Sequence, residues 1–582
     1  MRTVFSGSRL DWLLRLLLVA SVALVYWPVL HAGFVHWDDG LNITDNPHLS
    51  LTWENLRWMF TDASYARRYL PLGWLSYTPD RILFGGTARS YHAGNLLLHA
   101  CNTLLLYAIL KQLLIGKSQQ NFSGLQIAAA AGALWWAVNP MRVEAVAWAS
   151  ARIYCAAAFF FFLALWLYLR QANAPEPERG HSVVRWAALS FGISLFTYPV
   201  ALGGLALFVV LDVLPLERLP VKPAEWWLPK YRPVWAEKLW FLAPALIMLS
   251  ANFLARFNHP EVDSLVTLAQ FGLNARVMQA FWVWAWYLWK PWEPLDLAPK
   301  YPDLLGDVFS PAHLAAAALV GGITILLFLR RKIWPAALGA WICHVALLLP
   351  LSGFTEHPHF TTDRYSYIVS GLWACGISAG VLLCLRRELP LWAPAAGVAG
   401  LCGLLGWLAQ QQTLIWNNSL NLQTRMAESL GNNPQRALHD TAAARFLLDA
   451  NRPAEAAVTL RQALALKPDL PEAWGAFGDA LSAQNQTEQA IASYKRALEL
   501  KRELHSARQN LAVTLATAGR PEEALVQFSE LLRLQPSNAS AHYNLALTLN
   551  RLGRKEEARV HYEEFKRRQA ESDPRRKEMG LR

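Results

Sequence analysis

Two adjacent carboxylates, Asp38 and Asp39, follow the first long apolar stretch of the sequence, residues 12–30, and come directly after Trp37. A stretch of about 20 apolar residues is long enough to cross a bilayer. Three arginines precede or open it: Arg2, Arg9 and Arg15. Positive charge on this side favours a cytoplasmic N-terminus, so the acidic pair is expected on the opposite side of the membrane. Carboxylates there need a cation, a basic ligand or an exchanging proton as partner; the alternative is a solvated loop in which an aspartate caps a helix.

The composition is typical of a polytopic membrane protein that carries a soluble region. Of the 582 residues, 54% are hydrophobic and 17% charged, and 27 are tryptophan, a residue that collects at membrane interfaces. The formal net charge of +11 is spread over loops and the C-terminal region. Membrane orientation and anionic lipids account for this charge better than a nucleic acid does. We therefore expect a membrane partner and no nucleic-acid partner.

Near residue 417 the sequence becomes amphipathic and alanine-rich, and it repeats with a period of 34 residues. The shift aligns small residues, Ala456, Ala490, Ala524 and Ala558, and large ones, Leu460, Tyr494, Phe528 and Tyr562. This spacing resembles the tetratricopeptide repeat, a helix–turn–helix unit; a generic array of helical hairpins is the alternative. Four repeats are expected, at 437–470, 471–504, 505–538 and 539–572. Stacked repeats of this kind present a concave binding surface.

The sequence before the repeats alternates apolar stretches with short loops. Eleven stretches are candidate spans: 12–30, 94–115, 125–146, 153–170, 185–198, 200–214, 239–256, 312–329, 334–351, 366–385 and 391–411. With this count the basic clusters of the loops fall on the cytoplasmic side, provided that the tryptophan-rich segment 276–290 lies in the outer interface without crossing. An odd number of crossings places the repeats on the side opposite the N-terminus.

The predicted fold class is therefore all-α. A polytopic helical membrane domain over 1–412 is followed by a linker over 413–436, four tetratricopeptide repeats over 437–572 and a basic tail over 573–582. Four polar segments gather on the extracytoplasmic face: 32–93, 139–152, 290–303 and 352–367. Ionisable groups held at a membrane boundary are candidates for function.

Five strings in and around these segments carry a resemblance to a known family: FVHWDDGLNITDNPHLS, YLPLGWLSYTPDRILFG, YHAGNLLLHACNTLLLY, NPMRVEAVAWASAR and TTDRYSY. They resemble the bacterial relatives of the transmembrane-and-tetratricopeptide protein O-mannosyltransferases, within the GT-C superfamily of membrane glycosyltransferases. The resemblance covers nearly the whole chain. It implies transfer of a sugar from a polyprenyl-phosphate carrier to a hydroxyl of a protein or glycan. It also implies a bacterial inner-membrane location, with periplasmic repeats that recruit the acceptor or a protein partner.

The implied chemistry gives roles to the acidic residues. Displacement at the anomeric carbon requires the acceptor hydroxyl to lose a proton to a base. Asp38 and Asp39 match the family's acidic pair; Asp39 is favoured as the base, because Asp38 lies nearer the span and is suited to anchoring the loop. Glu144 matches a second acidic position and would hold a sugar hydroxyl or orient the acceptor.

The leaving phosphate needs positive charge and hydrogen-bond donors. Four cationic side chains are candidates: Arg142, Arg152, Lys300 and Arg364. For each arginine, anchoring to a lipid headgroup is the alternative. Four further site candidates are Trp37, His92, Asp363 and Tyr365. No cofactor is assigned, although the aspartate pair could hold a divalent cation through its oxygens.

The chain departs from the family pattern at several polar positions: Leu70 in place of an arginine, Tyr198 in place of a lysine, Ile153-Tyr154 in place of a Lys-Asp pair, and Asn139 in place of a histidine. These losses favour an alternative, a non-catalytic membrane scaffold whose repeats assemble an envelope complex. The retained acidic pair and the many expected spans favour the enzyme. A transporter is disfavoured, because the charges lie at the membrane boundary and not at its midplane.

Overall fold

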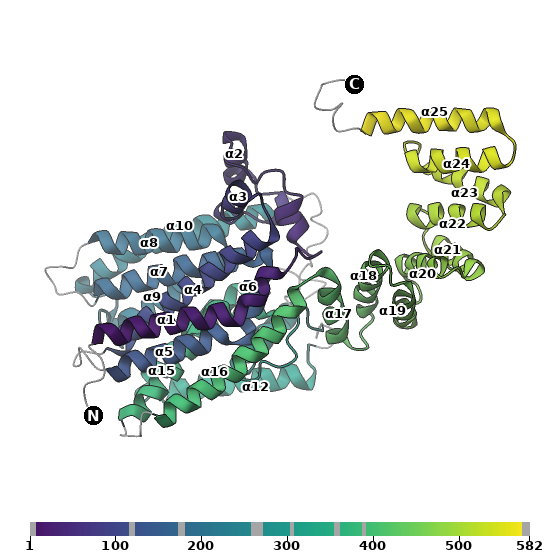
Figure 1. Cartoon of the computed structure of the whole chain (residues 1–582). Helices are drawn as coiled ribbons and strands as arrows, with labels where there is room; N and C mark the ends of the chain where they lie inside the picture. The colour runs from purple at the N-terminus through teal and green to yellow at the C-terminus, as the bar shows by residue number, and fades with distance from the viewer. Residues whose placement is uncertain are drawn as a thin grey trace. The chain divides into compact units, whose positions relative to one another are not determined.

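A computed structural model describes residues 7–115, 123–172, 181–257, 272–302, 308–353, 361–386 and 392–572. The described residues form helices and connecting loops without a β-strand, as the all-α prediction requires. They divide into two compact units, residues 1–418 and 419–582, each of which is considered by itself (Figure 1). The expected tail, 573–582, lies outside the described residues.

The first unit is a bundle whose long helices lie side by side (Figure 1). Its α-helices are α1 (Gly7–Tyr26), α2 (Trp53–Thr61), α3 (Pro71–Phe84), α4 (Ala88–Leu114), α5 (Ser123–Val138), α6 (Val143–Ala147), α7 (Arg152–Ala172), α8 (His181–Thr197), α9 (Gly204–Val213), α10 (Arg232–Phe257), α11 (Leu273–Trp289), α12 (Pro311–Leu329), α13 (Pro335–Leu348), α14 (Ser366–Val369), α15 (Gly371–Arg386) and α16 (Trp392–Thr413). The short helices α2, α3 and α6 lie toward the end of the bundle at which α1 finishes.

Six described helical segments are long and apolar enough to cross a membrane: Ser8–His31, Ala88–Leu114, Ala149–Gln171, Pro229–Ala255, Pro311–Leu329 and Ala393–Trp416. A seventh would be the pair Asp363–Val369 and Gly371–Leu385, which is bent by 53°. Four shorter apolar helices lie at the other expected spans: Ser123–Val138, Val183–Thr197, Pro199–Val213 and Pro335–Leu351. A helical membrane domain is thus confirmed, whereas the count of eleven crossings stays a prediction.

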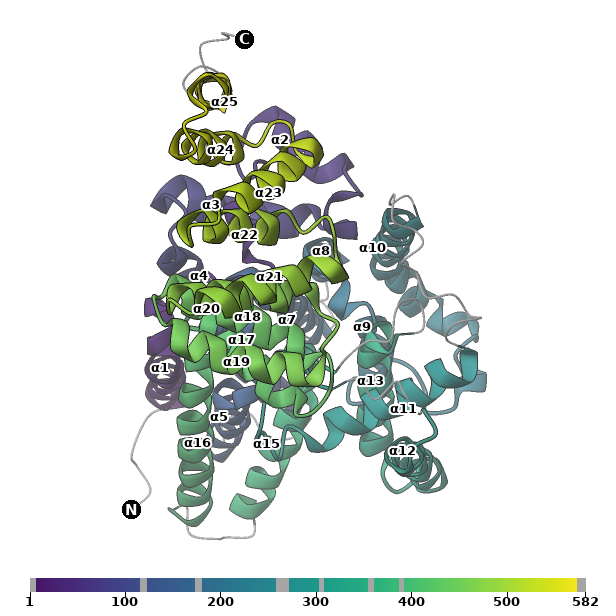
Figure 2. The same cartoon turned by 90° about the vertical axis from the view of Figure 1, so that its right-hand side faces the viewer.

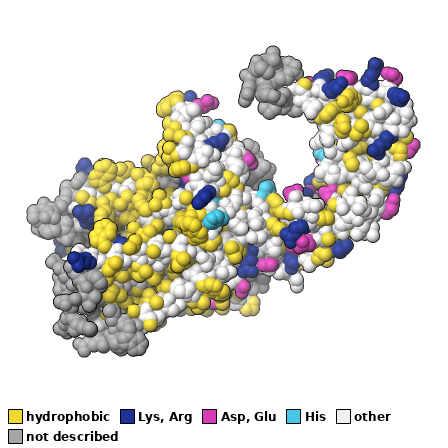
Figure 3. All heavy atoms as spheres, in the orientation of Figure 1, with side chains coloured by type: hydrophobic (Ala, Val, Ile, Leu, Met, Phe, Trp, Pro, Cys, Tyr) yellow, Lys and Arg dark blue, Asp and Glu magenta, His cyan; other side chains and the backbone are white. Residues whose placement is uncertain are grey.

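The surface of the bundle fits this assignment. On the face in Figure 3, hydrophobic side chains cover most of the first unit, and charged side chains are spread along the repeats. Helix α11, which contains most of the tryptophan-rich segment, packs against α12 and α13 (Figure 2). Its expected position in the outer interface stays a prediction.

Small residues allow the helices of the bundle to approach closely, as is usual between membrane helices. At the crossing of α5 and α15, a Cβ atom on Gly132 would lie 2.4 Å from the carbonyl oxygen of Ala374 and 2.2 Å from Oγ of Ser378. Three alanines of α5 are fully buried beside it: Ala128, Ala129 and Ala133. The sequence of α5 therefore fixes a tight contact between two candidate spans.

The second unit contains nine helices among its described residues, and eight of them form the four expected repeats. The helices are α17 (Ser419–Leu430), α18 (Arg436–Asp449), α19 (Pro453–Leu466), α20 (Pro471–Ala483), α21 (Thr487–Leu500), α22 (His505–Thr517), α23 (Pro521–Leu534), α24 (Ala539–Arg551) and α25 (Lys555–Ser572). Successive helices pack in order, beginning with α17 against α18. The range 413–436, expected to be a linker, therefore contains a helix that packs on the first repeat.

The residues that the period of 34 aligns form the core of the repeats. Ala456, Ala490 and Ala524 are fully buried, and so are the large residues Leu460 and Phe528. Tyr562, which ends the series, is 41% exposed, because no described helix follows α25. The repeat pattern thus gave the packing of this unit residue by residue.

A carboxylate links two neighbouring repeats. Asp479 of α20 accepts hydrogen bonds from the Tyr494 hydroxyl of α21 and from Nδ2 of Asn510 of α22, each at 2.7 Å. Burial raises the pKa of Asp479 above its ordinary value of 3.8, while these two donors oppose the rise. Ionised Asp479 is therefore less favourable in the folded repeats than in the unfolded chain.

We expect Gly132→Ala to destabilise the membrane unit, because the new methyl group must push the backbone of α15 away. Overpacking of this kind costs about 1–3 kcal/mol. Gly400→Ala is the matched control: a Cβ there meets nothing within 4 Å, and alanine favours a helix by about 1 kcal/mol. Thermal unfolding of the purified protein in detergent measures both. Equal melting temperatures for the two variants would contradict the close crossing.

We expect the free energy of unfolding of Asp479→Asn to increase relative to that of the wild type as pH rises. The folded-state pKa of Asp479 is raised, so wild-type stability falls as pH rises through it, whereas asparagine does not titrate. Denaturant unfolding of the repeats, followed for both proteins at pH 3.5 and pH 7, measures the difference. If the two proteins differ in unfolding free energy by the same amount at both pH values, the pKa of the Asp479 carboxyl is not shifted.

Candidate functional site

The two carboxylates of the expected acidic pair lie in different surroundings. Asp39 is 1% exposed; its Oδ2 accepts a hydrogen bond from the Val35 amide at 2.9 Å. Its Oδ1 accepts from the amide and the hydroxyl of Ser150, at 3.0 and 2.5 Å. Burial raises the pKa of Asp39, and these donors oppose the rise. Asp39 thus ties the first loop to the segment 139–152.

Asp38 is the accessible carboxylate of the pair. Its side chain is 32% exposed, and its Oδ2 lies 4.0 Å from Nη2 of Arg68. Next to it, Trp37 is also exposed at the surface. The sequence favoured Asp39 as the base and Asp38 as the anchor, and the burial of the two side chains favours the reverse assignment.

A buried ion pair joins two of the polar segments. Glu144, in α6, is 2% exposed, and its Oε2 accepts a hydrogen bond from the backbone amide of Arg364 at 2.8 Å. Its Oε1 is bound by Nη1 of the same arginine. The Arg364 guanidinium also donates through Nε to the Tyr154 hydroxyl at 3.1 Å and keeps 16% of its side chain exposed. Glu144 therefore orients Arg364 through both its backbone amide and its guanidinium.

Aromatic rings surround the Arg364 guanidinium. Its Cζ atom lies 5.5 Å from the Trp148 ring, 5.8 Å from the Tyr154 ring and 5.2 Å from the Tyr365 ring. The neighbouring Asp363, which is 2% exposed, accepts a hydrogen bond from the Tyr301 hydroxyl at 2.6 Å. Parts of the segments 139–152, 290–303 and 352–367 thus meet at one place.

The other basic candidates are oriented differently. Arg142 is fully buried and donates to the hydroxyls of Ser366 and Ser370, at 2.7 and 3.0 Å. Arg152 is also buried; both of its terminal nitrogens bind Asp80, and its Nε donates to Asn95. Both guanidiniums are buried, and Nε and Nη1 of Arg142 have no hydrogen-bond partner among the described residues. The expected role of these two arginines at the phosphate stays a prediction.

Two further candidates are His92 and Lys300. His92 is 1% exposed, and its Nε2 lies 3.4 Å from the Gly33 carbonyl oxygen, so it supports the first loop from within. Lys300 is partly exposed on the same segment as Tyr301.

The structure adds three residues to the cluster. Arg68, with 41% of its side chain exposed, lies with its Nη2 4.0 Å from Oδ2 of Asp38; burial lowers the pKa of Arg68, whereas Tyr198, Tyr154 and Asp38 raise it. The Tyr154 hydroxyl donates to the Tyr198 hydroxyl at 3.2 Å, and the two ring centres are 4.7 Å apart. The only sequence signal for the tyrosines was that both depart from the family pattern. Arg68 had no signal beyond its place in a charged loop.

The acidic pair does not form a joint cation site. Hydrogen bonds already occupy both oxygens of Asp39, and Asp38 faces a guanidinium. Within the described ranges, no group of three or more histidine, cysteine, aspartate or glutamate side chains is arranged to hold a metal ion. The possible divalent cation therefore gains no ligand set from the described residues.

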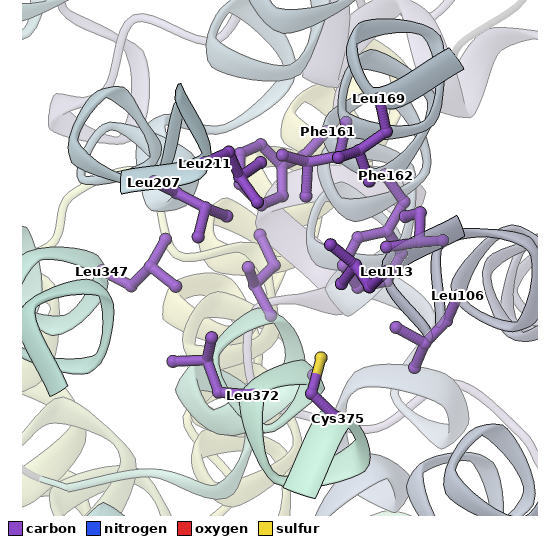
Figure 4. A pocket seen from close by; sticks show the side chains of 14 residues that line it. Leu106, Leu113, Phe161, Phe162, Leu169, Leu207, Leu211, Leu347, Leu372 and Cys375 are labelled. Atoms are coloured by element: carbon purple, nitrogen blue, oxygen red, sulfur yellow. The ribbon is translucent and has the colours of Figure 1, made fainter. Parts of the chain in front are cut away.

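Two cavities in the first unit are apolar. One, of about 60 Å³, lies between α4, α7, α9, α13 and α15 and is lined by hydrocarbon side chains and Cys375 (Figure 4). The other is a groove of about 700 Å³ between α8 and α10, with Leu72 and Phe196 among its lining residues and Arg185 also beside it. Neither contains a group for acid–base chemistry, so the polar cluster is the candidate functional site.

Comparisons with known families match the C-terminal repeats. Residues 447–512 and 510–574 match two models of the tetratricopeptide repeat. The chain is 28% identical over 211 residues to protein O-mannosyl-transferase TMTC2 of Homo sapiens and 29% identical to that of Mus musculus. Each match covers 34% of this chain and 24% of the relative, so the chain matches about a quarter of the relatives' length.

Comparisons with solved structures find repeat proteins. The crystal structure of MamA is 18% identical, with a TM-score of 0.24, and the match covers 26% of this chain and 87% of that one. YrrB, described as a tetratricopeptide-repeat protein with an unusual peptide-binding site, is 20% identical, with a TM-score of 0.24 and coverage of 33% and 92%. The chain is thus a helical membrane domain followed by tetratricopeptide repeats, with partial similarity to protein O-mannosyl-transferases.

Proposed function

We propose that this protein is a membrane glycosyltransferase that moves a sugar from a polyprenyl-phosphate carrier to a hydroxyl, with a protein as the acceptor. The observations that carry the proposal are the accessible carboxylate of Asp38, which lies beside the Arg68 guanidinium, and the ion pair of Glu144 with the partly exposed Arg364. The partial similarity to protein O-mannosyl-transferases supports the same reaction class. An accessible base and a cationic site for a leaving phosphate are what such a transfer needs.

In the proposed reaction the acceptor hydroxyl attacks the anomeric carbon of the lipid-linked sugar. Asp38 takes the hydroxyl proton as the new carbon–oxygen bond forms. The bond between the anomeric carbon and the phosphate oxygen breaks, and its electron pair leaves with the phosphate. Arg364 and Arg68 stabilise the charge that develops there, and Glu144 holds Arg364 in position without touching the substrate.

In this proposal the isoprenoid tail of the carrier binds in the apolar groove between α8 and α10. Phe196, which lines the groove, is two residues from Tyr198 of the cluster. A tail in the groove would therefore leave its phosphate within the same part of the molecule as Arg68. With its tail bound in this groove, the carrier would not have to leave the lipid phase during the reaction.

The proposal places the cluster and the repeats outside the cytoplasm, in a bacterial inner membrane. The repeats would recruit a protein or glycan acceptor, or a partner protein, through their concave face. The proposed division remains a membrane domain at 1–412, a connection at 413–436, repeats at 437–572 and a tail at 573–582. A scaffold without catalytic activity is the competing outcome of the tests.

We expect Asp38→Asn to abolish most sugar transfer while the protein remains folded, because removing a general base costs about 10²–10⁴-fold in rate. Asp39→Asn is the matched variant. It should lower stability instead, since an amide cannot accept all three hydrogen bonds that Asp39 accepts. Transfer from a radiolabelled polyprenyl-phosphate sugar, measured beside thermal unfolding in detergent, separates the two effects. Full transfer by Asp38→Asn would remove Asp38 from the reaction, whereas a wild-type protein that transfers no sugar would favour a scaffold.

A further inference from the structure

A hydrogen-bonded chain leads outward from the buried ion pair and ends in a hydroxyl. Glu144 binds Arg364, Arg364 donates through Nε to the Tyr154 oxygen, and Tyr154 donates to the Tyr198 oxygen. A phenolic hydroxyl has one proton to donate. Tyr154 uses its proton on Tyr198, so the proton of Tyr198 points out of the chain. Among the described residues, the structure records no acceptor for it.

Tyr198 is the end of the chain that a ligand can reach. It is partly exposed, whereas the Tyr154 side chain is buried. Tyr198 directly follows α8, and Pro199 begins the next helical turn, so the local backbone holds the ring at the edge of the bundle. The direction of the hydrogen bond between the tyrosines decides which proton stays unused. Since Tyr154 donates to Tyr198, the unused proton is that of Tyr198.

Two guanidiniums belong to the surroundings of this hydroxyl. Arg364 approaches from the inner side, where it donates to Tyr154. Burial lowers the pKa of Arg68, whereas Tyr198, Tyr154, Asp38 and Tyr365 raise it, as expected for a guanidinium in the same neighbourhood. A free O–H donor between guanidiniums suits a group that only accepts hydrogen bonds and carries negative charge. The nearby carboxylates, Asp38 and Glu144, face the arginines and leave the Tyr198 hydroxyl uncovered.

We propose that Tyr198 and Arg68 together bind a non-bridging oxygen of the phosphate in the lipid-linked donor, an inference that rests on the proposed function. Tyr154 positions Tyr198 by occupying its oxygen, so that the free proton is directed at the ligand. The phosphate is therefore held by a neutral hydroxyl and a half-exposed arginine, and not by the buried Arg142 and Arg152.

The test measures binding of a polyprenyl monophosphate to the full-length protein in detergent, with the same polyprenol lacking phosphate as a second ligand. We expect Tyr198→Phe to weaken binding of the phosphorylated lipid by about tenfold or more, since a hydrogen bond to a charged group is lost. Arg68→Gln should have at least the same effect. Binding of the unphosphorylated polyprenol should not change in either variant.

Tyr69→Phe is the matched control, because within the described part of the chain the Tyr69 hydroxyl donates to the Phe60 carbonyl oxygen, at 3.0 Å, and to no other group. It should bind both lipids like the wild type. If Tyr198→Phe and Arg68→Gln both bind the phosphorylated lipid with wild-type affinity, the assignment is wrong. If they lose both ligands equally, the residues support the fold and not the phosphate, and the assignment is also wrong.

The binding assay also separates this inference from the proposed reaction. Phosphate-dependent binding that needs Tyr198, in a protein that transfers no sugar, would leave the inference standing and overturn the enzyme. If the protein transfers sugar and Tyr198→Phe has an unchanged KM for the donor, the enzyme stands and the inference about Tyr198 is overturned. A wild-type protein that binds no polyprenyl monophosphate would overturn both.

Discussion

The candidate site depends on the ion pair between Glu144 and Arg364, which is buried at the end of a membrane-embedded bundle. A carboxylate removed from water is strongly unfavourable unless a cation and hydrogen-bond donors compensate it. Arg364 supplies both, through its guanidinium and its backbone amide. Because the pair must keep this geometry, it fixes α6 against the turn that contains Arg364. The position of Tyr154, and through it that of Tyr198, follows from the same arginine.

The same requirement explains why the two aspartates of the first loop differ. Asp39 is buried and can remain so only because three donors satisfy its oxygens. Asp38 keeps 32% of its side chain exposed, and its distance of 4.0 Å from Arg68 leaves it open to water and to ligands. Asp39 has helical backbone angles at the start of the helical turn Gly40–Thr44, where successive side chains point about 100° apart, so the two carboxylates meet different surroundings. Anchoring therefore falls to Asp39, and the proposed chemistry to Asp38.

Sequence periodicity predicted the repeats well, because in a helical array the burial of each residue follows from its place in the period. The apolar stretches predicted the helices of the membrane unit for a similar reason. The candidate site could not be predicted to the same depth. The segment 139–152 folds as short helical turns into the interior, so Arg142, Arg152 and Glu144 are all buried there. No sequence period marks such a segment, and sequence analysis predicts that a loop at the membrane boundary is exposed. Partners far apart in sequence, such as Asp80 for Arg152, decide which arginine remains available.

The tyrosine pair shows how a polar site can be kept at a membrane boundary with fewer charges. Burying a hydroxyl that has a hydrogen-bond partner is far less unfavourable than burying an ionised group. Tyr154 and Tyr198 depart from the family pattern at positions 44 residues apart in the sequence, yet their hydroxyls share one hydrogen bond. The two departures therefore form one structural feature and are not independent losses. Because Arg364 fixes the inner hydroxyl, the outer one keeps a directed donor, and the site retains polar groups for an anion where the sequence alone suggested that they had disappeared.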